Sequence, residues 1–388
     1  LEALADLHDV RDEHKALYKV LGTLADIAPN GHDRAVIQRR MARIAEDRLS
    51  DREAALALWD EVSRVEADDR ESLQQLQRLH ASGEDWTAYV DACEREIALA
   101  KDLPDRMTDL LRSVANASET QLADAFQAQQ AWRRVLEVYP DDLEALQALR
   151  RLYRDSGDLE ALSGVLTRLA DGGRIVGDDL KVLCEEHARL LTDELGRNEG
   201  AITWWNRVME MEPSSPAALE ALDRLYEDTG RLPECVAIVK RRATYATDTA
   251  HKAELLVRAA EIEGDRMKDA PAAASTLEEV AGFDPANLDV SQRLQMLYQR
   301  IEDWDRLADV LLRRDGILKE VEDRVSNLQE LARVYENRKN DRDSAFIILV
   351  KASDVNPADE TTLADLWRLA QTQECWRDYV DSIAEIVD

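Results

Sequence analysis

The segment AITWWNRVMEMEP, residues 201–213, carries the pattern that decides the fold. Ala201, Trp205 and Val208 are spaced by four and then three residues, and Pro213 follows five residues later. Positions i, i+4 and i+7 lie on one face of an α-helix. Proline ends a helix because it lacks the N–H group and clashes with the preceding turn. The segment therefore predicts a helix with one buried stripe that stops just before Pro213.

The same pattern returns along the chain with a period of 72 or 73 residues, which is typical of a repeat architecture. The prolines at this position are Pro140, Pro213, Pro285 and Pro357. The helical stripe before the proline position consists of Ala55, Trp59 and Val62, then Ala128, Trp132 and Val135, then Ala201, Trp205 and Val208, then Ala273, Leu277 and Val280, and finally Ala345, Leu349 and Ala352. Five copies with an incomplete one before them predict the approximate units 1–30, 31–103, 104–176, 177–247, 248–320 and 321–388.

A second apolar stripe follows each proline position. Its leucines are Leu76, Leu79, Leu149, Leu152, Leu222, Leu225, Leu294, Leu297, Leu366 and Leu369. We expect that helix to break at Glu84, Gly157, Gly230, Glu302 and Glu374, and the next one to begin at Trp86, Leu159, Leu232, Trp304 and Trp376. One upstream position is alanine in all five copies, as Ala42, Ala115, Ala188, Ala260 and Ala332. We interpret this alanine as the point where two helices approach closely.

These marks resemble the tetratricopeptide repeat (TPR) family, most clearly in residues 201–213 and in LEALDRLYEDTGRLPECV, residues 219–236. The resemblance covers essentially the whole chain, although Leu fills several aromatic positions and the full signature appears only in every second hairpin. It implies an all-α, right-handed superhelical solenoid of about eleven helical hairpins, or some 22 helices, in which each hairpin buries its apolar face against its neighbours. We expect one continuous solenoid over residues 1–388. A related class, the half-a-TPR repeats, stays open as an alternative, and ADGGRIVGDD (170–179) is expected to be a longer inter-repeat loop or else a hinge.

The charge of the chain bears on its partners. It has 80 acidic and 50 basic residues among 388, for a net charge of −30. Nucleic acid and anionic membrane surfaces would be repelled, so neither is expected as a partner. No apolar run approaches the ~18 residues that would predict a transmembrane helix. The chain begins at Leu1 rather than Met, so we expect a fragment or a processed chain, and a targeting signal could lie upstream.

Sequence motifs for catalysis and for cofactor or metal binding are missing. We expect no enzyme activity and no cofactor. The acidic pairs Asp68–Asp69, Asp141–Asp142 and Asp178–Asp179 fall at predicted helix starts, where carboxylates cap free N–H groups. Most of the tryptophans fall at repeat core positions, as do two histidines, His80 and His187. We interpret the four separated cysteines as reduced and buried; they are Cys93, Cys184, Cys235 and Cys375.

One repeat position is unusually basic. The resemblance to the TPR family implies that the residue at this position lies on the first helix of each hairpin and faces the concave groove. Seven of its ten occurrences are arginine, namely Arg43, Arg78, Arg151, Arg189, Arg224, Arg333 and Arg368. The other three are Asn116, Glu261 and Met296. Arginine can hold a carboxylate through two hydrogen bonds. We expect either a basic row that binds acidic segments or, as the alternative, ion pairs that link neighbouring helices.

The sequence as a whole predicts a non-catalytic scaffold that binds a protein or peptide on the concave face, possibly one with acidic or carboxylate-bearing segments. Two alternatives stay open. The chain could be a spacer or assembly subunit of a larger complex, or the regulatory adaptor region of a longer protein whose catalytic domain lies elsewhere. Its oligomeric state is not predicted.

Overall fold

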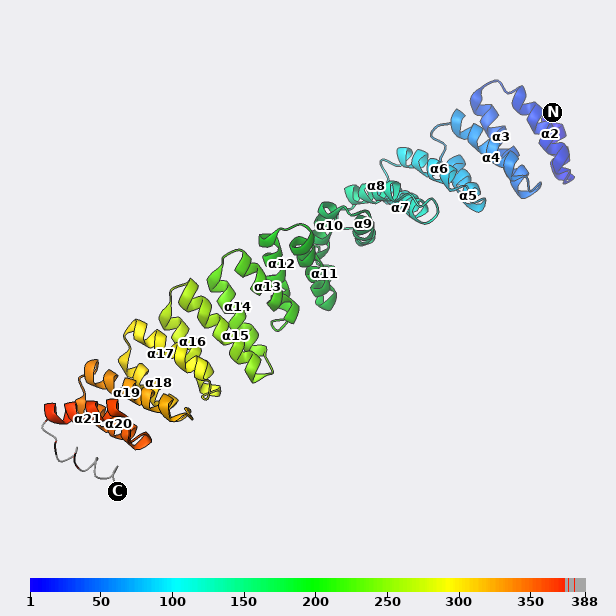
Figure 1. Cartoon of the computed structure of the whole chain (residues 1–388). Helices are drawn as coiled ribbons and strands as arrows, with labels where there is room; N and C mark the ends of the chain where they lie inside the picture. The colour runs from blue at the N-terminus through cyan, green and yellow to red at the C-terminus, as the bar shows by residue number, and fades with distance from the viewer. Residues whose placement is uncertain (374–375, 377–379, 381–388) are drawn as a thin grey trace. The chain divides into compact units, whose positions relative to one another are not determined.

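The computed structural model describes residues 1–373, 376 and 380 (Figure 1). These residues form 21 α-helices and no β-strand. The contacts between residues divide the chain into two compact units, Leu1–Gly196 and Arg197–Asp388, which are treated separately below. None of the described helices combines the length and the apolar character that crossing a membrane requires.

The first unit contains eleven α-helices, the last of which continues into a short π-helical turn. Their bounds are α1 (Glu2–Val10), α2 (His14–Asp26), α3 (Gly31–Asp47), α4 (Arg52–Val65), α5 (Arg70–Ser82), α6 (Trp86–Leu99), α7 (Pro104–Thr120), α8 (Ala125–Val138), α9 (Leu143–Ser156), α10 (Leu159–Asp171), α11 (Gly177–Arg189) and η1 (Leu190–Glu194).

The second unit contains the remaining ten α-helices and a second π-helical turn in the equivalent place. Their bounds are α12 (Asn198–Met211), α13 (Pro216–Asp228), α14 (Leu232–Tyr245), α15 (Thr249–Glu261), η2 (Ile262–Arg266), α16 (Ala270–Phe283), α17 (Leu288–Ile301), α18 (Trp304–Asp315), α19 (Val321–Asn337), α20 (Arg342–Val355) and α21 (Glu360–Gln373). The hairpin predicted to follow α20 would need residues beyond those described.

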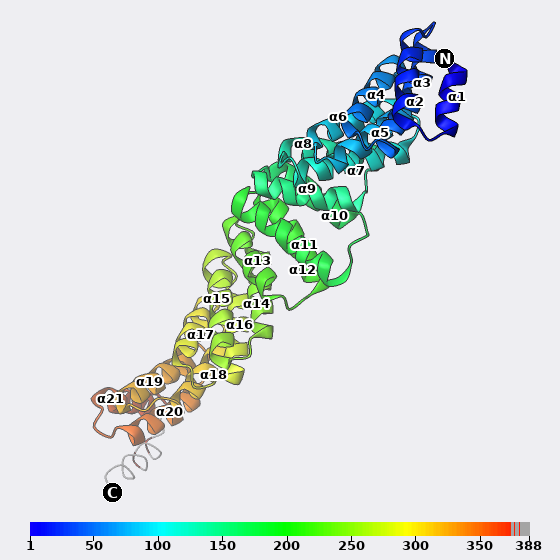
Figure 2. The ribbon, with the colours of Figure 1, turned by 90° about the vertical axis from the view of Figure 1, so that its right-hand side faces the viewer.

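Each helix packs chiefly against the helices before and after it within its unit (Figure 2). Ion pairs show which helices then lie side by side. In the second unit, Arg293 on α17 pairs with Glu261 on α15, whereas Arg313 on α18 pairs with Glu278 on α16. Odd-numbered and even-numbered helices therefore form two separate layers in this unit. In the first unit, the same arrangement is seen in pairs that join α5 to α3 and α6 to α4.

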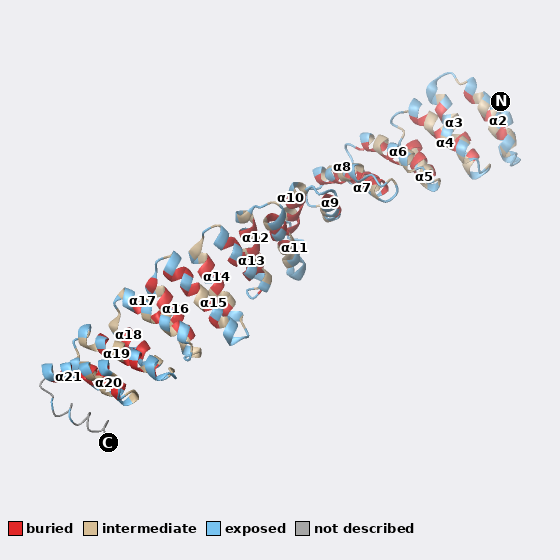
Figure 3. Cartoon of the chain, in the orientation of Figure 1, coloured by how far each residue is buried: buried red, intermediate tan, exposed pale blue. Residues whose placement is uncertain are grey.

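The predicted stripes form the core, which runs between the two layers (Figure 3). Every alanine, tryptophan, leucine and valine of the stripe before the proline position is buried, and Trp59 and Trp132 are only 1% exposed. The five equivalent alanines, from Ala42 to Ala332, are buried as well. Of the second stripe, only Leu297 departs from this pattern, because it is half-buried. Trp86 and Trp304, expected in the core, are half-buried at the first turns of α6 and α18, and Trp376 is 42% exposed.

Two further core expectations concern single residues. His187 is 2% exposed, as expected, while His80 is only half-buried. Cys93, Cys184 and Cys235 are buried and carry no disulfide, and Cys375 lies outside the described residues. Burial raises the pKa of Cys93 to about 12 and that of Cys235 to about 11, so both thiols stay protonated at neutral pH.

The helix breaks repeat in the backbone as well as in the sequence. The chain takes a left-handed conformation, with φ between 55° and 73°, at Asp12, Glu84, Gly157, Gly230 and Glu302. A second set follows the first helix of each copy, at Ser50, Ala123, Gly196, Lys268 and Asn340. The predicted break at Glu374 lies outside the described residues. Both sets keep the period of 72 or 73 residues, so the 72-residue unit is a structural unit.

Helix starts follow the predicted boundaries. Trp86, Leu159, Leu232 and Trp304 are the first residues of α6, α10, α14 and α18, while the helix predicted from Trp376 lies largely outside the described residues. Aspartates cap many helices, as where Asp142 accepts a hydrogen bond from the Ala145 N–H of α9. Residues 172–176 connect α10 to α11, in the predicted loop, whereas the two compact units meet at Gly196–Arg197. A single continuous solenoid over the whole chain stays a prediction.

Candidate functional site

The basic repeat position lies on the odd-numbered helices throughout. All ten of its residues are exposed, one on each odd-numbered helix from α3 to α21. In the first unit these are Arg43, Arg78, Asn116, Arg151 and Arg189, and in the second unit they are Arg224, Glu261, Met296, Arg333 and Arg368. Each unit therefore presents a row of these side chains on the outer surface of its odd-numbered layer.

Most of these arginines already have a carboxylate partner. In the first unit, Arg78 pairs with Glu46, Arg151 lies 2.5 Å from Glu119, and Arg43 also makes an ion pair with the following odd-numbered helix. Arg189 contacts Glu185 of its own helix at 3.4 Å. Since these four side chains are 57–61% exposed, the pairs are solvent-accessible. Three of the four pairs link neighbouring helices, as the alternative expectation states, whereas the Arg189 pair lies within α11. Exposed pairs of this kind contribute only ~0–1 kcal/mol each.

The arginines of the row in the second unit differ from one another in their ion-pair partners. Arg368 donates hydrogen bonds of 2.6 and 2.8 Å to the two oxygens of Glu336, which raises the pKa of Arg368 and lowers that of Glu336. Arg224 pairs with Glu220 on its own helix, at 2.5 Å. Arg333 is exposed and makes no ion pair with any residue that the structure describes.

One ion pair recurs at equivalent places. Glu46–Arg78, Glu119–Arg151 and Glu336–Arg368 each join two successive odd-numbered helices across the same repeat positions. In the third copy Thr192 stands in place of the glutamate. In the fourth copy both partners are replaced, by Gly264 and Met296.

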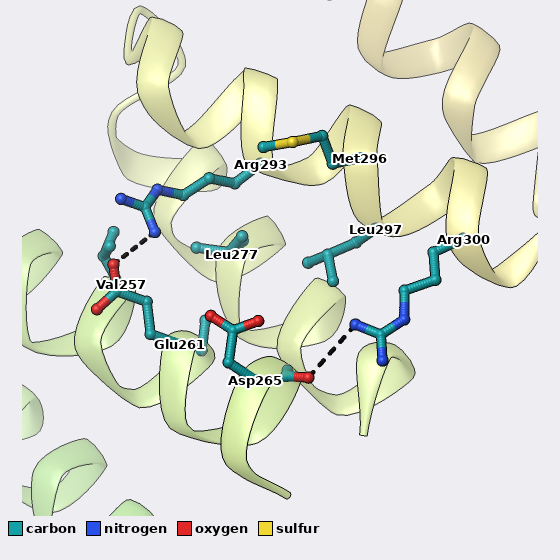
Figure 4. A pocket seen from close by; sticks show the side chains of 10 residues that line it. Val257, Glu261, Asp265, Leu277, Arg293, Met296, Leu297 and Arg300 are labelled. Atoms are coloured by element: carbon teal, nitrogen blue, oxygen red, sulfur yellow. Dashed lines mark hydrogen bonds and ion pairs between the residues drawn. The ribbon is translucent and has the colours of Figure 1, made fainter. Parts of the chain in front are cut away.

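A pocket of about 270 Å³ opens at this place in the fourth copy, between α15, η2, α16 and α17 (Figure 4). Its apolar lining consists of Val257, Ala260, Leu277, Met296 and Leu297. Met296 is 62% exposed, and Leu297 is the one half-buried leucine of the second stripe. The pocket lies wholly within the second unit.

The pocket exists because several of its lining residues are smaller or less polar than the residues at the equivalent positions of the other repeat copies. The equivalents of Leu277 in the first three copies are Trp59, Trp132 and Trp205. The equivalents of Val257 are all polar or charged, namely Arg39, Arg112, Glu185 and Gln329. Together with the exchange of the Glu–Arg pair for Gly264 and Met296, these changes remove both side-chain volume and charge from one spot.

Gly264 fits a tight place beneath the pocket. A Cβ atom added there would lie 3.3 Å from the Cβ of Ala273, which is tighter than most contacts of this kind. The neighbouring Glu263 is buried and is held by Lys240 at 2.7 Å and by the Thr276 hydroxyl at 2.6 Å. These contacts fix η2, a π-helical turn of the kind that is frequent at functional sites.

Charged groups surround the opening of the pocket. Glu261 and Arg293 face each other across it at 2.5 Å, and Arg293 also contacts Asp289 at 2.7 Å (Figure 4). Arg300 donates one long hydrogen bond, 3.4 Å, to the carbonyl oxygen of Gly264. Neither Asp265 nor Arg300 has an ion-pair partner within the described part of the chain. The opening therefore offers one carboxylate and one guanidinium that are not engaged by an opposite charge.

The residues in this pocket are suited to binding an apolar group. No group of three or more His, Cys, Asp or Glu among the described residues is placed to hold a metal ion. The pocket combines an apolar floor with hydrogen-bonding groups around it, an arrangement typical of sites that bind side chains or small ligands.

Sequence reasoning placed the arginine row but missed the pocket. The signal was present in the repeat alignment, where Glu261 and Met296 break the basic pattern and Leu277 replaces tryptophan. Each difference taken singly is an ordinary variation. Their common location becomes visible only when α15, α16 and α17 are packed together.

Comparison with known proteins finds solved structures of similar fold, but no match to a protein family or to a curated protein sequence. No protein-family model matches the chain, and no curated protein matches it. The structure of Naa15/Naa10 bound to HypK-THB is 16% identical, covering 98% of this chain and 62% of that one, with a TM-score of 0.38. This chain thus spans 62% of the length of that one.

Two further neighbours are described as TPR proteins. One from Parabacteroides merdae is 13% identical over 68% of this chain and 98% of its own, with a TM-score of 0.28. YrrB, a TPR protein with an unusual peptide-binding site, is 13% identical over 52% of this chain and 96% of its own, with a TM-score of 0.27. The helix pairs, the buried stripes and the 72-residue period of the chain itself give it a TPR-like, all-α helical-repeat fold.

Proposed function

We propose that the chain is a non-catalytic scaffold that binds a protein or peptide segment along the exposed surface of its odd-numbered helices. The TPR resemblance predicts this surface to be the concave face. The proposed ligand carries acidic or carboxylate-bearing residues that meet the arginine row. Neither nucleic acid nor membrane insertion is part of the proposal.

The observation that carries the proposal is the exposure of the arginine row. Seven arginines recur at one position of the odd-numbered layer, and the six that are ion-paired are 49–74% exposed. An exposed pair contributes so little that a ligand carboxylate can replace the internal one at small cost. Because an arginine grips a carboxylate in a fixed geometry, a row of them favours an extended acidic segment over a diffuse negative charge.

The test is a selection for peptides followed by charge reversal. A display library of short random peptides is selected on the full chain, and the affinity of the enriched peptides is measured by fluorescence anisotropy. Arg78→Glu/Arg151→Glu in the first unit and Arg224→Glu/Arg368→Glu in the second are then compared with the unaltered protein. We expect at least one double variant to lose affinity by about tenfold or more, since each removes two charge-assisted contacts and adds repulsion.

Matched controls exist on the even-numbered layer. Arg64 on α4 and Arg306 on α18 are 69% and 62% exposed, so Arg64→Glu and Arg306→Glu make the same charge change on the other surface. Circular dichroism verifies that all variants stay helical. If no peptide is enriched, or if the control variants weaken binding equally, peptide binding by the odd-numbered layer is contradicted. The spacer and adaptor alternatives would then remain.

A further inference from the structure

We propose that the pocket between α15 and α17 is the anchor site of this surface, and that it takes one large apolar side chain of an extended peptide segment with an acidic residue close by. The inference rests on the proposed function and adds the type of residue that is selected. A row of arginines alone would bind any acidic segment, whereas an anchor pocket favours those acidic segments that also carry a large apolar residue.

The internal repeats provide the first argument. Three features make room at this point: Leu277 in place of tryptophan, Val257 in place of a polar or charged residue, and loss of the recurring Glu–Arg pair. The fifth copy also has a leucine, Leu349, in place of the tryptophan, yet it keeps the Glu336–Arg368 pair. The fourth copy is therefore the one in which smaller residues and loss of charge coincide.

The exposed apolar surface provides the second argument. The other described leucines at the Leu297 position are 0–5% exposed, whereas Leu297 lies half-buried at the wall of the pocket. Met296 stands beside it, 62% exposed, where three of the other copies carry a solvated arginine of the recurring ion pair. Apolar surface of this kind is unfavourable in water and becomes favourable when another apolar group covers it.

The size of the pocket limits what covers it. An engineered cavity of about 150 Å³ holds benzene. The volume here, about 270 Å³, leaves room for one side chain as large as leucine, phenylalanine or tryptophan. Methionine at the opening adapts its shape to either an aliphatic or an aromatic partner.

The charges at the opening select a peptide with a nearby acidic residue. The carboxylate of Asp265 and the guanidinium of Arg300, which make no ion pair with the described residues, suit the N–H and C=O groups of an extended backbone. Gln295 and Gln299 of α17 donate hydrogen bonds of 2.7 and 2.8 Å to Glu330 of α19. Arg333 lies on the same helix as Glu330, one turn further along. Neither Arg300 nor Arg333 makes an ion pair with the residues that the structure describes, so each is available to an acidic residue within a few positions of the apolar one.

The test uses peptides selected from the random library on the full chain. We expect the enriched peptides to share one large apolar residue with an acidic residue within about three positions, the reach of an extended chain across ~10 Å between helices. Leu277→Trp, which restores the residue of the first three copies, and Met296→Arg, which restores the arginine of the row, should each reduce affinity by about tenfold or more. Replacing the apolar residue of the peptide by alanine should do the same.

Two matched variants separate filling of the pocket from general disturbance. Leu349→Trp makes the same change one copy later, and Met296→Leu keeps the apolar character, so both should retain affinity within about twofold. The ¹³C-methyl resonance of Met296, identified from its loss in Met296→Leu, should shift when the selected peptide is added and not when its alanine version is added. A peptide that binds Leu277→Trp and Met296→Arg as tightly as the unaltered protein overturns the anchor site.

The outcomes also separate the two proposals. If the enriched peptides depend on Arg224 and Arg368 but not on the pocket, the anchor site is wrong and the scaffold function stands. If no peptide is enriched, both are wrong. If the peptides require the apolar residue but are unaffected by Arg300→Glu and Arg333→Glu, the acidic requirement is wrong, and with it the ligand class stated above.

Discussion

The Nε2 atom of His187 lies 2.8 Å from the hydroxyl oxygen of Ser163, and this contact joins α11 to α10 in the core of the first unit. Burial lowers the pKa of His187 to about 4. In the unfolded chain a histidine has a pKa of about 6.5. The unfolded state therefore binds a proton more readily between these two values, and the stability that the neutral histidine contributes is lost as the pH falls from about 6.5 towards 4.

The first prediction follows from this titration. We expect the unfolding free energy to fall between pH 7 and pH 5 in a way that His187→Gln, which has no titrating group, does not share. The full shift corresponds to about 3 kcal/mol, of which a little under about 2 kcal/mol falls between pH 7 and pH 5. Urea unfolding at both pH values, followed by circular dichroism, measures the difference. Equal pH dependence of the two proteins would contradict the burial of a neutral histidine at this position.

The second prediction concerns the invariant alanine. Ala115 and Ala188 are fully buried where neighbouring helices pack, so Ala115→Leu and Ala188→Leu add volume where there is none. We expect each to lower the unfolding free energy by ~1–3 kcal/mol. Ala364→Leu makes the same change at an exposed position of α21 and should leave stability nearly unchanged. Unchanged denaturation midpoints for the two core variants would mean that these helices do not cross as described.

The third prediction concerns a buried carboxylate. The Glu96 side chain is almost fully buried and accepts hydrogen bonds of 3.0 and 2.9 Å from Arg106 and of 2.8 Å from Gln77. Burial alone would raise the pKa of Glu96, but these hydrogen bonds lower it below its ordinary value. Removing the arginine would leave a buried charge without a partner, which typically costs ~3–5 kcal/mol.

We therefore expect Arg106→Met to be strongly destabilising and Glu96→Gln/Arg106→Met to be less so, because the amide can be buried at lower cost than the charge. Urea denaturation of the single and double variants forms a double-mutant cycle. The contribution of Glu96 should also disappear as the pH falls below its unfolded pKa of about 4.3, since a lowered pKa stabilises only the ionised form. Additive single effects would show that the two side chains do not interact.

The fourth prediction uses the repeated left-handed turn. Glycine takes this conformation at Gly157 and Gly230, whereas Glu302 takes it at φ 58°. A side chain with a Cβ atom is strained there by roughly 1 kcal/mol, so Glu302→Gly should raise the thermal midpoint and Gly157→Ala should lower it. Glu302→Ala retains the strain without the carboxylate and separates the two contributions. A lower midpoint for Glu302→Gly would mean that the glutamate side chain stabilises the turn more than the strain costs.

Much of the fold was predictable because the residues that pack between helices recur at equivalent positions in each repeat. A single Ala-x3-Trp spacing is weak, but five equivalents at Ala55, Ala128, Ala201, Ala273 and Ala345 fix which helix face is buried. The same redundancy located the turns at Gly157 and Glu302, although glutamate is not an ordinary residue for that conformation. What repetition does not predict is the position of a side chain that lies at the margin of the core, such as Trp86 or Trp304.

The candidate site was harder to predict, for a related reason. The row of exposed arginines repeats and is visible in the sequence, whereas the pocket arises where the repeat fails. Val257 and Gly264 lie on the continuous helix formed by α15 and η2, and they meet Leu277 of α16 only after the helices pack. The ion pairs of the row depend on side-chain rotamers, so their partners, such as Glu119 for Arg151, could not be read from spacing alone.

The contacts of each helix are mainly with the helices next to it along the chain, and this determines which helices a bound peptide segment would stabilise. In a globular domain a ligand protects the whole cooperative structure, but here the gain in protection should be confined to the hairpins that it touches. Amide hydrogen exchange would then report the footprint directly. Slower exchange in α15 and α17, with unchanged rates in α20, would mark occupancy of the fourth copy without any mutation.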